Sequence, residues 1–154
     1  MNGAAKTWPP SALLLTVAAI MLIGTGLYFI LLRPALLPED IRYMGLSATQ
    51  LDGVRDPLAA WLTQVFRVMG GYVLATGVLA ITLALTSYRE HHKGAWLGAL
   101  VGGIASIGWM TVVNFAIRSD FKWVLLSMAL VWAASIIVFW TERRSLNASA
   151  MSAR

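Results

Sequence analysis

The chain has 154 residues, of which 58% are hydrophobic and only 12% are charged, whereas a soluble domain carries about 25% charged residues. This composition excludes an ordinary soluble globular protein and predicts a protein that lies in a lipid bilayer. The net charge of +5 does not indicate nucleic-acid binding, because the basic residues stand at the ends of apolar segments and leave no soluble surface for a nucleic acid.

Four apolar segments are long enough to cross a bilayer, because a hydrocarbon core of roughly 30 Å needs about 20 residues of helix. We expect these spans at about residues 11–32, 62–88, 95–117 and 121–140. The first span exceeds the roughly 7–15 apolar residues of a signal peptide and is followed by no Ala-x-Ala site, so we expect it to be retained. The sequence therefore predicts a single all-α membrane domain over residues 1–154: an integral membrane four-helix bundle with short helices in its first extramembrane loop.

Basic and aromatic residues at the ends of the spans predict how the protein is oriented in the membrane. Slightly more Lys and Arg residues lie on the side of the termini than on the other, which predicts a multi-pass protein of the inner membrane with both termini in the cytoplasm. Tryptophans also mark the span ends, as aromatic belts do: Trp8, Trp96 and Trp140 on one side, Trp61 and Trp123 on the other. Trp109 and Trp132 lie inside their spans, where we expect them to fill helix contacts, with stacking on a ligand as the alternative.

The first loop, residues 33–61, contains residues that typically start and end short helices. Pro38 stands at a first-turn position with acidic residues behind it, and Gly45 can end that helix. Ser47 and Gln50 match a capping box, and Asp56 is a candidate N-cap for the second long helix. We expect this loop to act as a lid over the mouth of the bundle.

Arg67 stands at the start of the apolar part of the second span, in the stretch Phe66 to Tyr72. Its side chain points toward the helix N-terminus and can reach the headgroup layer. Gly70 and Gly71 follow it, and small residues let another helix approach closely, so we expect Arg67 to face the bundle. Three interpretations stay open: an ion pair that docks the lid, a site for an anionic ligand such as a fatty carboxylate, and an unpaired anchor. The candidate partners of Arg67 are the acids of the first loop: Glu39, Asp40, Asp52 and Asp56.

The third span carries a second set of small residues. Gly98, Gly102 and Ser106 repeat every four residues, a pattern typical of close helix packing, either inside the bundle or against a second copy of the chain. Thr111 and Asn114 add polar groups that we expect to form hydrogen bonds between helices. No acid or histidine lies deep in any span, which disfavours proton-coupled transport.

The sequence predicts no metal, cofactor or catalytic site. Cysteine is absent, which excludes disulfides and thiolate ligands. His91 and His92 are adjacent, but a metal site of this kind needs a third ligand. A membrane enzyme would need acid–base or metal residues in one pocket, and the candidates lie on opposite sides of the membrane.

The motif Arg67-x-x-Gly70-Gly71, with small residues through Gly77, four compact spans and a long first loop, resembles the DoxX-like small bacterial membrane proteins and related families of unknown function. The resemblance implies a four-helix membrane bundle, and some members are accessory subunits of membrane-associated oxidoreductases. It implies no catalytic residues.

From these observations we expect a non-enzymatic integral membrane protein. It would be an accessory subunit of a membrane complex or a binder of a lipid-like anionic ligand, and its partners would be membrane lipid, other membrane subunits or a second copy of itself. A small oligomeric transporter or channel is the alternative, favoured by the glycine-rich face of the third span.

Overall fold

The computed structural model describes residues 8–152, and within that range it contains helices, turns and loops but no strand. Four helical segments are long and apolar enough to cross a membrane: α1 (Pro10–Leu31), α4 with its continuation η1 (Arg55–Tyr88), the third segment (Ala95–Ala116) and α7 (Lys122–Ser152). The all-α class and the four apolar helices are thus confirmed, whereas the bundle, the single domain and the membrane itself stay predictions.

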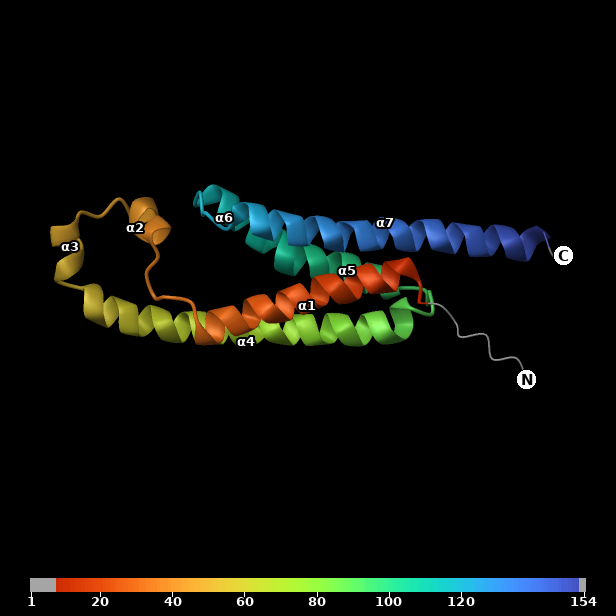
Figure 1. Ribbon diagram of the computed structural model, residues 1–154, viewed down its shortest axis with the longest axis horizontal. Helices are drawn as coiled ribbons and strands as arrows, with labels where there is room; N and C mark the ends of the chain where they lie inside the picture. Colours follow the sequence, from red (N-terminus) through yellow and green to blue (C-terminus); the bar gives the residue numbers. More distant parts are fainter. Residues whose placement is uncertain (1–7, 153–154) are drawn as a thin grey trace.

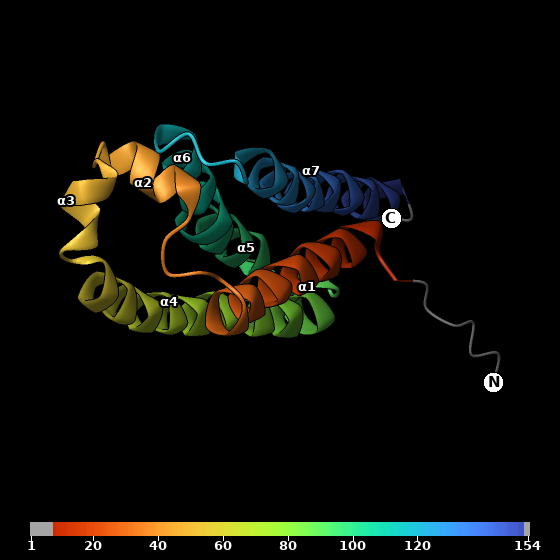
Figure 2. The same cartoon turned by 60° about the vertical axis from the view of Figure 1, so that its left-hand side comes forward.

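Helix α1 lies at the centre of the packing. It runs along α4 (Arg55–Leu83) on one side and along α7 on the other, and the third long segment packs mainly on α7 (Figure 1). Helices α4 and α6 (Trp109–Ala116) diverge toward the end of the molecule that carries α2 and α3 (Figure 2). The molecule is therefore tightly packed around α1 and open between α4 and α6.

Glycines allow α1 and α4 to cross closely. A Cβ atom added to Gly26 would lie 2.8 Å from the carbonyl oxygen of Gly70, and one added to Gly77 would lie 2.6 Å from Cγ1 of Ile23. Both distances are too short for a real side chain, so the two helices cross this closely only because Gly26 and Gly77 have none. The expectation for Gly71 needs correction, because a Cβ there would meet nothing within 4 Å.

The third segment is interrupted by a π-helical turn. It consists of α5 (Ala95–Gly103), η2 (Ile104–Gly108) and α6. Helix α5 packs on α7 through Gly103, which lies against the Trp132 indole, and the indole N–H donates to the carbonyl oxygen of Ala99 at 2.8 Å. Trp132 thus fills a helix contact, as expected.

The small residues expected to pack in this segment lie on another face. Gly98 has only the Leu83 side chain at 3.8 Å, and Gly102 has nothing within 4 Å of an added Cβ. The hydroxyl of Ser106 donates to the carbonyl oxygen of Gly102 in its own helix. Thr111 and Asn114 likewise bond to carbonyl oxygens one turn back, not to another helix as expected. The four-residue spacing does mark a face of small residues, but that face does not pack on α7. The face that packs on α7 lies one residue further along the chain.

The first loop forms the two expected short helices. Helix α2 (Pro38–Met44) ends at Gly45, whose φ of 66° is left-handed, and α3 (Ala48–Asp52) begins with the reciprocal Ser47–Gln50 capping box. Helix α4 begins at Arg55 after Val54, which makes no side-chain cap, so Asp56 lies in the first turn and is not the N-cap. Helix α4 continues into a π-helical segment, η1 (Ala84–Tyr88), so the second long segment ends at the expected residue 88. One further difference concerns length: α7 extends to Ser152, well beyond residue 140.

Tryptophans gather at the ends of the long helices. At the end where α1 begins, the ring of Trp96 lies 5.0 Å from that of Trp140, and Arg89 stacks over Trp8 at 4.8 Å. At the other end Trp123 packs edge-on against Phe115 at 5.3 Å. Trp109, in contrast, is 65% exposed, so it does not fill a helix contact.

Candidate functional site

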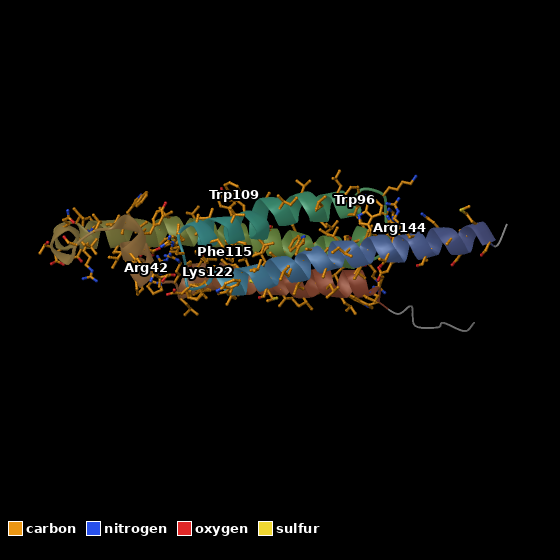
Figure 3. The ribbon with its side chains drawn as sticks, turned by 90° about the horizontal axis from the view of Figure 1, so that it is seen from above. Arg42, Trp96, Trp109, Phe115, Lys122 and Arg144 are labelled. Atoms are coloured by element: carbon orange, nitrogen blue, oxygen red, sulfur yellow. The ribbon has the colours of Figure 1, made fainter. Side chains whose placement is uncertain are left out.

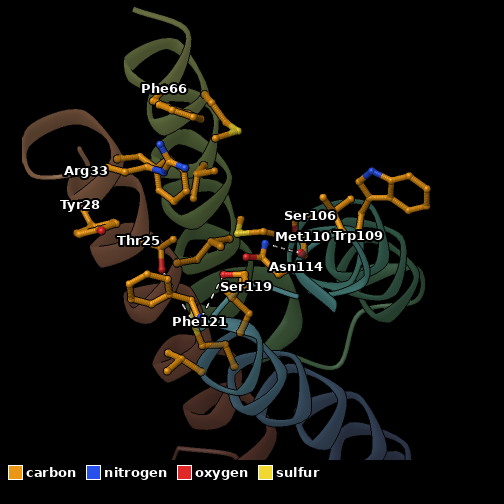
Figure 4. Close-up of a pocket in the computed structure, with 18 of the residues that line it drawn as sticks. Thr25, Tyr28, Arg33, Phe66, Ser106, Trp109, Met110, Asn114, Ser119 and Phe121 are labelled. Carbon is orange, nitrogen blue, oxygen red and sulfur yellow. Dashed lines mark hydrogen bonds between the residues drawn. The ribbon is translucent and has the colours of Figure 1, made fainter. Parts of the chain in front are cut away.

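A cavity of about 1160 Å³ lies between α1, α4, η2, α6 and the beginning of α7, below α2. We call it the open cavity. Its walls are mostly apolar and include methionine and aliphatic side chains such as Met21, Val65, Met69, Met110 and Met128. All three charged side chains of its lining, Arg33, Glu39 and Asp40, lie on α2 or on the segment that leads into it. Figure 4 shows Arg33 and Phe66 on one side of the cavity and Asn114 and Ser119 on the opposite side. The site thus combines an apolar chamber with a polar mouth.

Arg33 is the arginine of this mouth. Its Nη2 lies 3.2 Å from Oδ2 of Asp40, its Nη1 donates to the carbonyl oxygen of Pro34 at 3.0 Å, and its side chain is only 9% exposed. The guanidinium carbon lies 3.4 Å from the centre of the Phe66 ring, a cation–π contact that suits the planar arginine group. The same Asp40 oxygen accepts the Leu37 backbone N–H at 2.9 Å and so closes the first turn of α2. This ion pair therefore docks α2 onto α1 and α4.

Arg67 does not take the place expected for it. It is exposed, it forms no ion pair with any of residues 8–152, and it does not line the open cavity. The reason lies in the helix face: α1 packs on the Gly70 side of α4, whereas Gly71, on the stripe of Arg67, faces open space. The docked-lid ion pair exists, but Arg33 forms it.

The four loop acids are separated by the structure into two pairs. Glu39 and Asp40 line the open cavity, whereas Asp52 and Asp56 are exposed, lie outside it and form no ion pair within residues 8–152. The latter two stand on α3 and on the first turn of α4, which project away from the mouth (Figure 1). Only the part of the loop around α2 covers the cavity.

Glu39 is the most buried charged residue at the mouth, at 4% exposed. Its Oε1 accepts the hydroxyl of Ser119 at 3.2 Å, and that hydroxyl oxygen accepts the backbone N–H of Phe121 at 3.1 Å. Nearby, Arg42 donates to the carbonyl oxygen of Arg118 at 3.0 Å. These bonds hold α2 to the turn between α6 and α7, so α2 bridges the two walls of the cavity.

A second polar cluster lies at the opposite end of the molecule. The Glu142 carboxylate accepts the Ser11 backbone N–H at 3.1 Å and the Ser11 hydroxyl, and its Oε2 lies 2.9 Å from Nε2 of His91. Serine, histidine and an acid are the residue types of a catalytic triad, but here both Ser11 and His91 bond to the carboxylate and not to each other. The pairing of nucleophile and base that such catalysis needs is absent from this cluster, which joins α1, α7 and the turn after η1.

The described part of the chain, residues 8–152, holds no group of three His, Asp or Glu side chains that could bind a metal ion. His92 pairs with Glu90 at 2.8 Å and is largely exposed. Sequence reasoning missed the roles of Ser119 and Glu142, because their partners Glu39, Ser11 and His91 are distant along the chain, and it also missed the pairing of Arg33 with Asp40. The short distance from Arg33 to Asp40, one beyond the end of α1 and the other in the first turn of α2, was the one usable signal.

No protein-family model, curated protein or solved structure matches this chain. The resemblance to DoxX-like proteins therefore stays a prediction, drawn from the layout of the spans and from a motif whose arginine points away from the cavity.

Proposed function

We propose that this chain is a non-enzymatic integral membrane protein that binds one amphipathic lipid, with the apolar chain of the lipid inside the open cavity. The observation that carries the proposal is the cavity itself: at about 1160 Å³ it exceeds the roughly 300–1000 Å³ of most small-molecule sites, and like them it is mainly apolar with a few polar groups. The methionines of its wall suit a flexible hydrocarbon chain, because their unbranched side chains adapt to irregular shapes.

The outer surface supports membrane embedding. Large apolar residues are widely exposed along the long helices, among them Ile20, Leu79, Ile104, Leu130 and Ile137, each more than half exposed. In Figure 3 the exposed rings of Trp109 and Phe115 lie between Arg42 and Lys122 toward one end and Arg144 toward the other. Such a surface would be costly in water but is suited to lipid.

The orientation and the membrane belong to the proposal. Helix α1 begins and α7 ends at the same end of the molecule (Figure 1), so an even number of crossings fits the helices. We place that end in the cytoplasm and the protein in the inner membrane, on the positive-inside rule. The open cavity then faces the other side of the membrane, beneath α2.

The lipid site is compatible with a helper role in a membrane complex, such as the DoxX resemblance implies. The site of an anionic ligand at Arg67 is not part of this proposal, because Arg67 does not line the cavity.

A cavity-filling variant tests the proposal. Gly24 lines the open cavity, and a Cβ there would meet nothing within 4 Å, so Gly24→Phe adds a ring beside the cavity without a backbone clash. Gly71→Phe is the matched control, because Gly71 has the same open surroundings but does not line the cavity.

The measurement is native mass spectrometry of each protein after mild detergent extraction. We expect a retained lipid on the wild type and on Gly71→Phe, and a several-fold loss of it on Gly24→Phe. A lipid-free wild type, or equal lipid retention by the two variants, would contradict a cavity-bound lipid.

A small oligomeric transporter or channel is the second candidate function, favoured by the unfilled face of the third segment. Gly102 has no neighbour within 4 Å of an added Cβ, and Val101, Ile104 and Trp109 beside it are all more than half exposed. Because the chain has no cysteine, Gly102→Cys can be crosslinked without background. Crosslinking between copies would support an oligomer, and its absence at any protein density in vesicles would exclude this interface.

A further inference from the structure

We infer that the lipid head group bound at the mouth of the open cavity carries a positively charged amine, and that Glu39 is its partner. The inference rests on the proposed function, since it assumes that a lipid chain fills the cavity, and it adds the chemistry of the head. It also departs from the anionic ligand that was one of the three interpretations of Arg67 in the sequence.

The surroundings of Glu39 are the first support. This side chain lines the cavity and is 4% exposed, yet no Lys, Arg or His among residues 8–152 forms an ion pair with it. Its Oε1 accepts one bond from Ser119, and its Oε2 accepts none from the described residues. Burial of a charged carboxylate is costly unless a cation or several donors compensate it, so Glu39 lacks the partner that a ligand ammonium would supply.

The charge of the mouth is the second support. Three charged residues line the cavity, namely Arg33, Glu39 and Asp40, and one positive charge against two negative ones leaves a formal charge of −1. Arg33 is already paired with Asp40 and stacked on Phe66. An anionic head would therefore meet a net negative lining whose arginine is already paired, whereas a cationic head would neutralise the charge of that lining.

The remaining polar and aromatic groups fit the same ligand. Asp40 Oδ1 and Asn114 Oδ1 accept no hydrogen bond from residues 8–152, so together with Glu39 Oε2 they give the cavity lining three acceptor atoms that a ligand donor can use. The rings of Tyr28 and Phe121, 6.2 Å apart, also line the cavity, and aromatic faces attract ammonium groups. A primary ammonium, with three N–H donors and no acceptor, matches this set.

Three probes with the same twelve-carbon chain test the inference: dodecylamine, dodecanol and dodecanoate. Binding of each to the delipidated wild type in nanodiscs is measured by displacement of a fluorescent lipid. We expect dodecylamine to bind at least about tenfold more tightly than dodecanol, a difference of about 1.4 kcal/mol, and dodecanoate to bind most weakly.

Two variants locate the effect. Glu39→Gln keeps the shape and the Ser119 bond but removes the charge, and it should reduce dodecylamine to the affinity of dodecanol. Asp52→Asn, which changes an exposed acid of the same loop outside the cavity, should leave the preference for the amine unchanged.

The outcomes separate the two proposals. If all three probes bind equally well, or if dodecanoate binds best, the lipid site stands and the cationic head is overturned. If the preference for the amine persists in Glu39→Gln, Glu39 is not its partner and the inference is overturned. If no probe displaces the fluorescent lipid from the wild type, the proposed function itself fails. The comparison of the three probes on the wild type needs no variant. It can therefore overturn the inference even if Glu39→Gln does not fold.

Discussion

The two ends of the molecule differ in how completely side chains fill the space between the helices. At the closed end, around Glu142, the Tyr88 ring lies 4.4 Å and the His91 ring 5.0 Å from the ring of Phe139, and Tyr88 and Phe139 are fully buried. At the open end, around Glu39, the aromatic rings stand at the wall of a cavity of about 1160 Å³. Each end has an acidic residue that joins distant segments, but only the closed end fills the space beside it.

This difference distinguishes a polar cluster that is structural from one that is available for binding. The Glu142 carboxylate accepts bonds from Ser11 and lies within hydrogen-bond distance of His91, and the Tyr88 hydroxyl donates to the carbonyl oxygen of Ser135 at 2.9 Å. These groups have their partners inside the chain. Glu39 has only Ser119, and it faces empty volume, which is the combination expected of a ligand site.

The largest effect should come from removing the central ring of the closed end. Phe139→Ala should lower the free energy of unfolding by about 3–5 kcal/mol, because it leaves a cavity between Tyr88, His91 and α7. Unfolding in SDS, followed by circular dichroism, measures it. Phe115→Ala is the control at the other end, where the ring is 39% exposed, and a loss as large as that of Phe139→Ala would contradict the contrast between the ends.

The next effect concerns the carboxylate that holds the closed end together. Glu142→Gln should cost about 2–3 kcal/mol in the same assay, because hydrogen bonds to a charged group are worth roughly 1.5–3 kcal/mol and the amide nitrogen cannot accept from Ser11 or His91. Glu90→Gln, which alters an exposed pair with His92, should cost less than about 1 kcal/mol. Equal losses would mean that Glu142 does not join the helices.

The sequence was sufficient for features that depend on neighbouring residues. Hydrophobic runs predicted the four long helices, and the turn residues Pro38, Gly45 and Ser47 predicted the two short ones, because spans, caps and turns are set by local composition. The end of α7 was missed, since a polar helix that continues beyond an apolar run has no hydropathy signal.

The candidate site was predicted only in part, for a physical reason. Glu39 and Asp40, two of the four acids proposed as partners of Arg67, line the open cavity, but the arginine that pairs with Asp40 is Arg33. Arg67 and Arg33 both stand at the edge of an apolar segment, and only the packing of Gly26 on Gly70 decides which faces inward. The π-helical turn at Ile104–Gly108 was likewise not predictable from the spacing of Gly98 and Gly102, which face away from α7.

The third prediction tests this reassignment at the open end. Arg33→Lys should weaken the docking of α2 by about 1–2 kcal/mol, because lysine cannot stack as a plane on Phe66 while it pairs with Asp40. Hydrogen exchange of residues 38–44 measures the local stability. Arg67→Lys is the matched control and should change it by less than about 0.5 kcal/mol, since the side chain is exposed. A reversed order would restore Arg67 as the docking residue.

The smallest effect should be confined to the end of α2. Gly45 has a left-handed φ of 66°, which costs a residue with a Cβ atom about 1–2 kcal/mol, so Gly45→Ala should destabilise α2 by about 1 kcal/mol. Gly53 has a right-handed φ of −71° and open space around it, so Gly53→Ala should instead stabilise the loop by about 0.4–1 kcal/mol by restricting the unfolded chain. Hydrogen exchange of residues 38–52 should therefore accelerate in the first variant and slow in the second, while SDS unfolding of both stays close to the wild type. A global loss of stability in Gly45→Ala would show that α2 supports the closed end as well, and the two ends would then be one cooperative unit.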